Sequence, residues 1–362
     1  MPEEHIATVG SRFLDYEIVN LLGRGGMGEV YLVRRGDEHY ALKLLSPSLA
    51  KSNPEYVKRF VREGKIAMRL NHPNLVSVYD VGFNEELGCH YLVMEYVNGY
   101  DLRSALALGG AMKPKEAVGI IAAVASALEA GEALGLVHRD IKPENIMVGN
   151  NGIIKLLDMG VAKARGTDSL NTMPRTVFGT PNYIAPEQAQ DASMVDSRAD
   201  TYSLGVVLYE MLAGERPYEC DRPKDVLAKL LSSEELPDIR DKHPEVPQKL
   251  AALLRLMLAK DRTKRIESPS KLLDVLKMIG YETSVEPAAV PEPQPAAQPD
   301  FSYSSYSSMP DNPTLSFDTK DEEIRSFVNS IKAKKRRNAM LRLTAISLVV
   351  LLAIIALAML LF

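Results

Sequence analysis

The sequence HRDIKPENIMV, at residues 138–148, brings an acid, a cation and an amide together within eight residues. Asp140 can accept a proton from a hydroxyl group, and Lys142 can neutralise charge that develops on a transferred group. Asn145 offers an amide oxygen, a ligand that suits a hard cation such as Mg²⁺. Pro143 lacks a backbone N–H and has a fixed φ, which predicts a loop here. Taken alone, this stretch would also fit a solvated turn, so its meaning depends on the rest of the chain.

A glycine-rich stretch, GRGGMGEV, occupies residues 23–30. Glycines let a backbone approach phosphate oxygens closely and present its N–H groups to them. In a dinucleotide-binding fold such a motif joins a strand to a helix. Here residues 30–33 continue as a strand, which argues against a nicotinamide-dependent oxidoreductase. The pattern favours a hairpin that covers phosphates.

Two charged residues stand in or next to apolar strands. Lys43 lies within the expected strand 40–45, where a buried ammonium group needs a partner. Glu63, on an expected helix at residues 55–70, is the best candidate, although an exposed helix face would explain Glu63 equally well. Asp158 follows a short strand and precedes Met159 and Gly160. An acid there suits a metal-bound phosphate, and an ordinary turn is the alternative.

The pattern along the chain predicts an α+β protein with a small, mostly β lobe and a larger, mostly helical lobe. Alternating apolar residues predict short strands before residue 96. Apolar helical periodicity dominates from residue 114 onward. The expected strands are 16–22, 31–33, 40–45 and 91–96, and the expected helices after residue 114 are 117–134, 197–213, 226–231, 248–259 and 269–279.

Composition narrows the class of protein. The 46% hydrophobic content supports a real core, and a net charge of −4 gives no case for nucleic-acid binding. Cys89 and Cys220 are far apart and fit neither a disulfide framework nor a zinc site, which indicates a reducing compartment. The polar N-terminus lacks the apolar region of a secretory signal.

Beyond residue 280 the composition changes. Residues 281–319 are rich in Pro, Ser and Ala and predict a disordered linker. Residues 320–342 form a basic juxtamembrane segment, in which an amphipathic helix at 321–337 could contact lipid headgroups or serve as a plain spacer. Residues 343–362 carry no charge and would span roughly 30 Å as a helix, enough to cross a bilayer core. Because basic residues flanking a span stay on the cytoplasmic side, we expect a cytoplasmic N-terminal part and a C-terminus on the far side of the cell membrane.

These separated motifs, in this order, resemble the protein-kinase signature set: glycine loop, strand lysine, helix glutamate, HRD loop, DFG-like acid and an APE motif at 185–187. The resemblance covers about residues 13–280. The strings GTPNYIAPEQ (179–188) and VDSRADTYSLGVVLYEMLAGERPYE (195–219) are similar to those of bacterial serine/threonine kinases of the eukaryotic-like (Hanks) type. The resemblance therefore implies a bilobal kinase domain at 13–280, anchored by a C-terminal transmembrane helix.

The resemblance implies that ATP is the phosphoryl donor and that Mg²⁺, or alternatively Mn²⁺, is the metal. Gly23, Gly25 and Gly28 would cover the phosphates, while Lys43 would hold the α- and β-phosphates and pair with Glu63. The adenine contacts would come from Leu22, Val30, Ala41 and Met147, the gatekeeper Met94, and the hinge from Glu95 to Val97.

The resemblance also implies the chemical roles in the HRD loop. Asp140 would be the base, Lys142 would stabilise the γ-phosphoryl group, and Asn145 and Asp158 would hold the metal. Thr180 would lie at the substrate, facing Asp140, in a pattern typical of serine/threonine kinases.

Two further contacts are implied away from the reacting groups. Asp200, on a buried helix, would anchor the HRD loop. Glu187 of the APE motif would form a structural ion pair with Arg265.

Regulation and partners follow from the same resemblance. Arg139 and Lys163 would bind a phosphate on the activation loop, with Thr172 and Thr176 as the candidate sites. Protein substrates with Ser or Thr, membrane lipid at the C-terminal helix and a kinase–kinase homodimer are the expected partners.

The sequence departs from the family pattern at Met159, in place of the usual Phe, and at Gly64, which should weaken its helix. The alternative function is a membrane-anchored pseudokinase scaffold that binds nucleotide or partners. Degenerate kinases usually lose the lysine, the base or the metal ligand, and Lys43, Asp140, Asn145 and Asp158 are all present.

Overall fold

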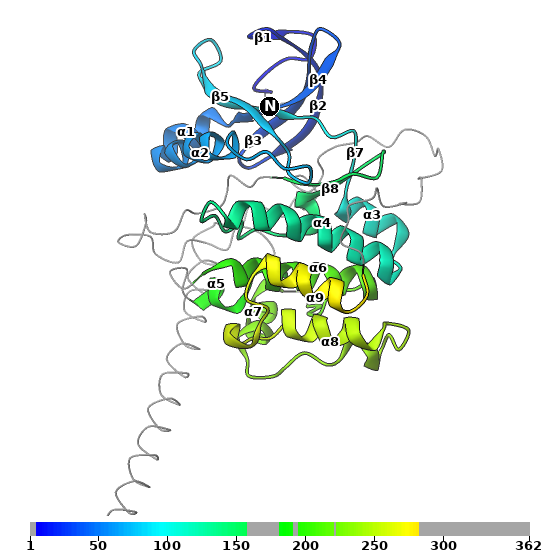
Figure 1. Cartoon of the computed structure of the whole chain (residues 1–362). Helices are drawn as coiled ribbons and strands as arrows, with labels where there is room; N and C mark the ends of the chain where they lie inside the picture. The colour runs from blue at the N-terminus through cyan, green and yellow to red at the C-terminus, as the bar shows by residue number, and fades with distance from the viewer. Residues whose placement is uncertain (1–4, 158–180, 191–194, 221, 282–362) are drawn as a thin grey trace, which may run out of the picture.

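The computed structural model describes residues 5–157, 181–190, 195–220 and 222–281. These residues form a β-rich lobe stacked on a larger helical lobe, as the sequence pattern predicted (Figure 1). Several predicted sites lie outside the described residues: Asp158, Lys163, Thr172, Thr176 and Thr180. The same holds for the predicted linker, juxtamembrane segment and transmembrane helix beyond residue 281.

The first lobe is built on an antiparallel six-stranded sheet with the order β1-β2-β3-β4-β6-β5. Buried residues alternate with partly exposed ones along most of β3, because one face of this strand packs into the core of the lobe. Most residues of β4 are buried, since its two faces contribute to different apolar clusters. The strands are β1 (Arg12–Phe13), β2 (Tyr16–Gly25), β3 (Gly28–Arg35), β4 (Glu38–Leu45), β5 (Val78–Asn84) and β6 (Cys89–Glu95). Two helices, α1 (Pro47–Ser52) and α2 (Pro54–Ala67), follow β4.

The expected strands and the expected helix at 55–70 are confirmed in this lobe, with α2 ending earlier, at Ala67. Helix α1 and strands β1 and β5 were not predicted from the sequence. Helix α1 buries none of its residues, so it carries no apolar stripe, and its start depends on a hydrogen bond from the Leu49 N–H to the Ser46 hydroxyl. Strand β5 is an edge strand with no clean alternation of burial.

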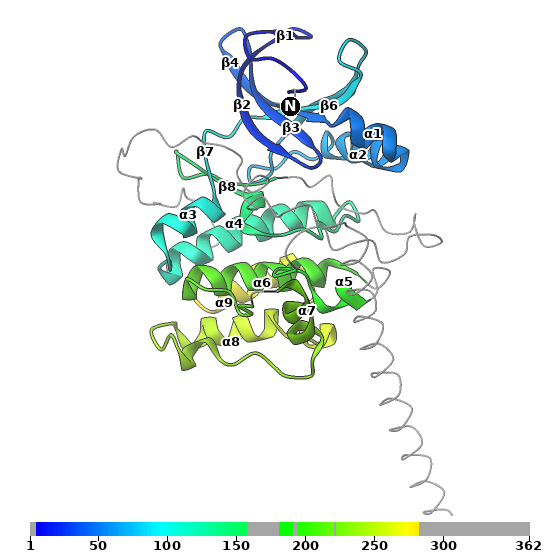
Figure 2. The same ribbon diagram turned by 180° about the vertical axis from the view of Figure 1, so that it is seen from behind.

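The second lobe is mostly helical, with a small three-stranded sheet at its upper side (Figure 2). Its helices are α3 (Leu102–Gly109), α4 (Pro114–Glu132), α5 (Pro186–Gln190), α6 (Ser197–Ala213), α7 (Pro223–Leu231), α8 (Gln248–Met257) and α9 (Pro269–Met278). The sheet consists of β7 (Gly99–Asp101), β8 (Ile146–Gly149) and β9 (Ile154–Leu156), and short 3-10 helices include η1 (Pro143–Asn145). The expected helices are all present with ends shifted by a few residues, whereas α3, α5, β7 and β8 were not predicted.

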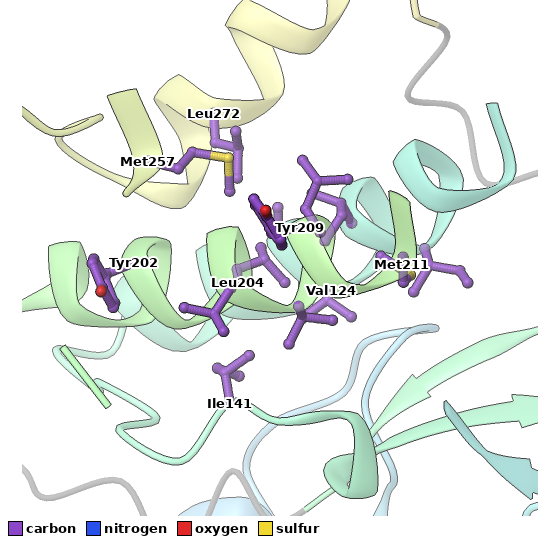
Figure 3. Packing of buried hydrophobic residues seen from close by; sticks show 14 of the residues in the cluster. Val124, Ile141, Tyr202, Leu204, Tyr209, Met211, Met257 and Leu272 are labelled. Atoms are coloured by element: carbon purple, nitrogen blue, oxygen red, sulfur yellow. The ribbon is translucent and has the colours of Figure 1, made fainter. Parts of the chain in front are cut away.

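Helix α6 is the centre of the second lobe. It is buried on nearly every side, which is typical of a helix at the core of a large domain. Its side chains pack against α4, α8 and α9, and Figure 3 shows Leu204 and Tyr209 of α6 with Val124 of α4 and Leu272 of α9. The residue after Asp140, Ile141, points from the HRD loop into the same cluster (Figure 3). The HRD loop is therefore attached to the core on its inner side.

Within the part of the chain that the structure describes, no helix combines the length and the apolar character needed to cross a membrane. The segment predicted to do so, 343–362, is not among those residues.

Gly64 has a packing role that was not predicted from the sequence. A Cβ atom added at this position would lie 2.9 Å from Val81 Cγ2 and 3.2 Å from Leu92 Cδ2. Such distances are too short for ordinary contacts, so glycine allows α2 to lie close against β5 and β6. The weaker helix propensity that the sequence indicates is thus accompanied by a tight helix–sheet contact.

We predict that Gly64→Ala destabilises the protein by roughly 1–3 kcal/mol, because overpacking outweighs the gain in helix propensity. Chemical unfolding of the full chain measures this change. Gly119→Ala in α4 is the matched control, since a Cβ there meets no atom within 4 Å, and it should be neutral or stabilising. Equal stabilisation of both variants would contradict the packing role of Gly64.

Candidate active site

The HRD loop is held in place by one buried carboxylate. Asp200 on α6 is 2% exposed and accepts hydrogen bonds from the backbone N–H of His138 and of Arg139, each at 2.7 Å. Burial raises the pKa of Asp200, and the nearby His138 and the two N–H donors act in the opposite direction. The predicted anchoring role of Asp200 is confirmed.

His138 connects the loop to the strand that leads to Asp158. Its ring is fully buried. Nδ1 accepts the Asp140 backbone N–H at 3.2 Å, so Nε2 carries the proton and donates to the Leu157 carbonyl oxygen at 2.9 Å. No role for His138 was predicted, although a histidine two residues before the predicted base was visible in the motif.

Asp140, Lys142 and Asn145 lie together, as the sequence predicted. Lys142 Nζ is 3.0 Å from Asp140 Oδ2. The Asn145 amide donates to the Asp140 carbonyl oxygen at 2.7 Å and to Asp140 Oδ2 at 3.0 Å. The Asp140 side chain is 44% exposed, so a hydroxyl group from another molecule can reach it. The arrangement fixes a carboxylate, with a cation at its side, at the surface of the lobe.

The side chain of Asn145 is placed to serve as a metal ligand. Its amide hydrogens are directed at Asp140, which leaves its amide oxygen for a cation. The backbone carbonyl oxygen of Asn145 accepts a hydrogen bond from the Leu157 N–H at 2.9 Å. Asn145 therefore lies beside Leu157, the residue that precedes Asp158. Among the residues described, no group of three or more His, Cys, Asp and Glu side chains is arranged to hold a metal ion. The metal pair of Asn145 and Asp158 stays a prediction.

The glycine-rich stretch forms the predicted hairpin. Strands β2 and β3 pair Gly23 with Val30 and Gly25 with Gly28. Gly28 has φ of +144°, and an added Cβ would lie 1.9 Å from the Leu44 carbonyl oxygen, so only glycine fits there. A Cβ at Gly26 would meet no atom within 4 Å, so the backbone at the tip is open to a ligand.

The sheet register brings the predicted nucleotide contacts to one face. Val30 is paired with Lys43, and Ala41 is paired with Met94. Paired residues point to the same face, as do residues two apart on one strand, so all four share a face. Lys43 is also paired with Leu92, which packs near Gly64 of α2. Lys43 therefore lies on the face that α2 covers, and its ion pair with Glu63 remains a prediction.

Two small apolar clusters, one from each side of the connection between the lobes, contain the predicted adenine contacts. Leu22, Ala41 and Met94 form one cluster, with Val30 packed against it. Val97, Met147 and Leu157 form the other. An apolar lining from both lobes suits a flat aromatic ring.

Val76 packs against both clusters. It was absent from the sequence prediction, because nothing in its neighbourhood marks it. A residue in the loop between α2 and β5 is thus the physical link between the two halves of the apolar lining.

Glu95, in the predicted hinge, is held by a lysine that was not predicted from the sequence. Lys155 Nζ lies 2.8 Å from Glu95 Oε1, and the Ser77 N–H donates to Glu95 Oε2 at 3.1 Å. The Lys155 side chain is 13% exposed. Its position in an apolar strand was a usable signal, since the same argument predicted a partner for Lys43.

A protein kinase domain family model matches residues 16–275. The chain belongs to the protein kinase family. It is 40% identical over 263 residues to the serine/threonine-protein kinase PknB of Mycolicibacterium smegmatis, covering 71% of this chain and 41% of the relative. It is 37% identical over 255 residues to PrkC of Bacillus subtilis, covering 70% and 38%. The chain thus spans about two-fifths of the length of these relatives.

The fold comparison agrees with the family. The crystal structure of the Mycobacterium tuberculosis PknI kinase domain superposes with a TM-score of 0.60 at 30% identity, covering 76% of this chain and 99% of that chain. The match to the complete PknI domain accounts for both lobes.

A buried ion pair holds the APE motif of the kinase domain in place, as predicted. Arg265 Nη1 lies 2.5 Å from Glu187 Oε1, and Nη2 lies 2.8 Å from Glu187 Oε2. The Arg265 side chain is fully buried. A bidentate pair of this kind has a fixed geometry, so it holds α5 against the second lobe.

Gln188, one residue later, joins the APE motif to the HRD loop of the kinase. Its Nε2 donates to the Arg139 carbonyl oxygen at 2.8 Å, and its Oε1 accepts the Ala185 N–H at 2.9 Å. Arg139 has φ of +68°, an uncommon conformation for a non-glycine residue. The Asp200 and Gln188 contacts together hold this conformation, and the role of Gln188 was not predicted.

A second polar network lies beside the loop. Arg103 of α3 contacts Glu144 at 3.0 Å, Glu210 at 2.8 Å and the Tyr183 hydroxyl. Tyr183 also donates to Glu210 at 2.6 Å. The network ties the residues around 183 to α6, and it could not be predicted from local patterns because its members lie far apart in the chain.

Proposed function

We propose that this chain is an ATP-dependent serine/threonine protein kinase that transfers the γ-phosphoryl group to Ser or Thr hydroxyls of proteins. The arrangement of Asp140, Lys142 and Asn145 on a loop anchored by Asp200 carries the proposal. Phosphoryl transfer depends mainly on alignment and on charge neutralisation, and these side chains supply both. The relationship to kinases such as PknB and PrkC supports it.

In this proposal Asp140 accepts the proton of the substrate hydroxyl, because its exposed carboxylate is kept in place by Lys142 and Asn145. Lys142 reduces the negative charge that develops on the transferred group. Asn145 and Asp158 would hold Mg²⁺, or Mn²⁺ in its place, which neutralises phosphate charge when bound. Lys43 would hold the phosphates beneath the glycine-rich hairpin, with Glu63 as its partner.

Replacing Asp140 with Asn should lower radiolabel transfer from ATP to a generic protein substrate by roughly 10²–10⁴-fold, because the base is lost. The control is Asp225→Asn, an exposed acid that pairs with Arg222 and should leave transfer unchanged. Equal transfer by wild type and Asp140→Asn would contradict the role of Asp140. If the wild type binds nucleotide but transfers no phosphate, the pseudokinase alternative holds.

We also propose that the kinase activates itself by phosphorylating its activation loop. Arg139 supports this proposal, because it precedes Asp140 directly in the chain. Its carbonyl oxygen also accepts a hydrogen bond from Gln188, the residue that follows the activation loop. Together with Lys163, Arg139 would pair with a phosphate on Thr172 or Thr176. Contact between two kinase domains would permit the reaction in trans, and a shared membrane would raise their effective concentration.

Mass spectrometry of the full chain incubated with ATP should find phosphate between residues 159 and 187, at Thr172 or Thr176. Active protein mixed with the Asp140→Asn variant should phosphorylate that variant on the same residues if the reaction occurs in trans. The Thr172→Ala, Thr176→Ala double variant is the control for site assignment. Absence of phosphate from the segment in the wild type would contradict self-activation.

Membrane tethering by residues 343–362 is the remaining part of the proposal. The uncharged run of 20 residues and the basic segment before it support a single span, with the kinase domain in the cytoplasm and lipid as the partner of the helix.

The full chain expressed in bacteria should sediment with the membrane fraction and need detergent for extraction, whereas a truncation after residue 340 should not. Alkaline carbonate washing separates insertion from peripheral attachment. A truncated chain that stays in the membrane after this wash would contradict the assignment.

A further inference from the structure

Glu29 is a buried carboxylate with no part in the proposed reaction. It follows Gly28 directly and is 2% exposed. Four donors surround it: the Arg24 Nε at 2.7 Å, the Tyr31 hydroxyl, the Ile6 backbone N–H at 2.8 Å and the His5 ring Nδ1 at 3.1 Å. A buried charge is stable only when such partners compensate for its lost hydration. The folded structure therefore depends on these four donors to keep Glu29 charged inside the lobe.

Two of these donors belong to the glycine-rich hairpin itself. Arg24 and Glu29 are directly paired across β2 and β3, and Tyr31 lies two residues along β3. Because neighbouring residues of a strand point to opposite faces, Glu29 and Tyr31 face the outer core while Val30 faces the proposed nucleotide site. The hairpin is therefore held from its outer face while its inner face stays available.

The other donors belong to the segment before β1. Ala7, which is 6% exposed, is bound through both of its backbone groups to the Tyr31 hydroxyl, at 3.1 and 3.0 Å. Further along, the Gly10 N–H donates to the Ile18 carbonyl oxygen at 2.8 Å. Residues 5–10 thus lie along the outer face of the hairpin, and their charge-assisted contact is with Glu29.

We propose that residues 5–7 and Glu29 form a brace that positions the glycine-rich hairpin for nucleotide binding, with Glu29 as a positioning residue. The inference rests on the proposed kinase function. The hairpin contains Gly23, Gly25, Gly26 and Gly28, and glycine loses more conformational freedom than other residues when it is fixed. The brace fixes the hairpin before the nucleotide arrives, so its loss should weaken nucleotide binding more than the transfer step.

The test compares the full chain with three variants: Glu29→Gln, a chain that starts at Thr8 after an initiator methionine, and the combination of the two. Each single variant should raise the KM for ATP about tenfold, a common size for the loss of hydrogen bonds to a charged group. The kcat at saturating ATP should stay within about twofold of wild type, because the lost contacts stabilise bound ATP equally in the ground state and in the transition state. Direct titration with a fluorescent ATP analogue should show the same loss of affinity.

The combined variant separates a brace from two unrelated defects. If Glu29 acts through residues 5–7, the double change should raise the KM little beyond either single change, whereas independent effects would multiply. Glu17→Gln is the matched control, because Glu17 forms an exposed ion pair with Arg34 at 2.6 Å on the same two strands. This control should leave the KM unchanged.

Specific outcomes would overturn the proposal. An unchanged KM for ATP in the chain that starts at Thr8 excludes the brace, because that variant keeps Glu29 and the whole hairpin. A fall in kcat with an unchanged KM, accompanied by a lower melting temperature, identifies Glu29 as merely structural. A wild-type chain that transfers no phosphate contradicts the proposed function instead, while nucleotide titration still tests the brace.

Discussion

The HRD loop depends on the carboxylate of Asp200, which is taken out of water and paired with two backbone N–H groups. Such groups are costly to bury without partners, so the contact specifies one path for the loop across the end of α6. Arg139 adopts its left-handed conformation within this contact, and the Gln188 amide binds the same residue from the other side. The exposed Asp140 follows immediately, so the backbone path that leads to the proposed base is set by Asp200 and Gln188, which have no part in the proposed reaction.

The site also depends on connections between the lobes. Val76 packs against the apolar clusters of both lobes, and Lys155 of the second lobe binds Glu95 at the hinge. On the first lobe, the hairpin uses its inner face for the proposed nucleotide contacts and its outer face for the Glu29 cluster. The geometry of the site is thus controlled from outside it, by buried polar contacts on elements that carry the reacting groups.

The sequence predicted most of the fold and the clustering of the proposed reacting groups on the HRD loop, for a physical reason. Asp140, Lys142 and Asn145 lie within six residues, so a local loop necessarily brings them close. Helices such as α8 and α9 bury apolar residues at a spacing of three and four, a pattern that appears directly in the order of apolar residues. Helix α1 and the edge strand β5 escaped prediction, because one buries nothing and the other lacks alternation.

The sequence by itself determined the family, the two-lobe architecture and the identity of the proposed base, cations and metal ligand. Of the distant contacts that support them, the family resemblance gave Asp200 and the pair of Glu187 with Arg265, and the tertiary structure alone decided the others. Lys155 with Glu95, Gln188 with Arg139, Arg103 with Glu210, and Glu29 with residues 5–6 are pairs separated by at least 23 positions. Periodicity and local motifs report on neighbours within a few residues, whereas the compensation of a buried charge depends on which segments the fold brings together.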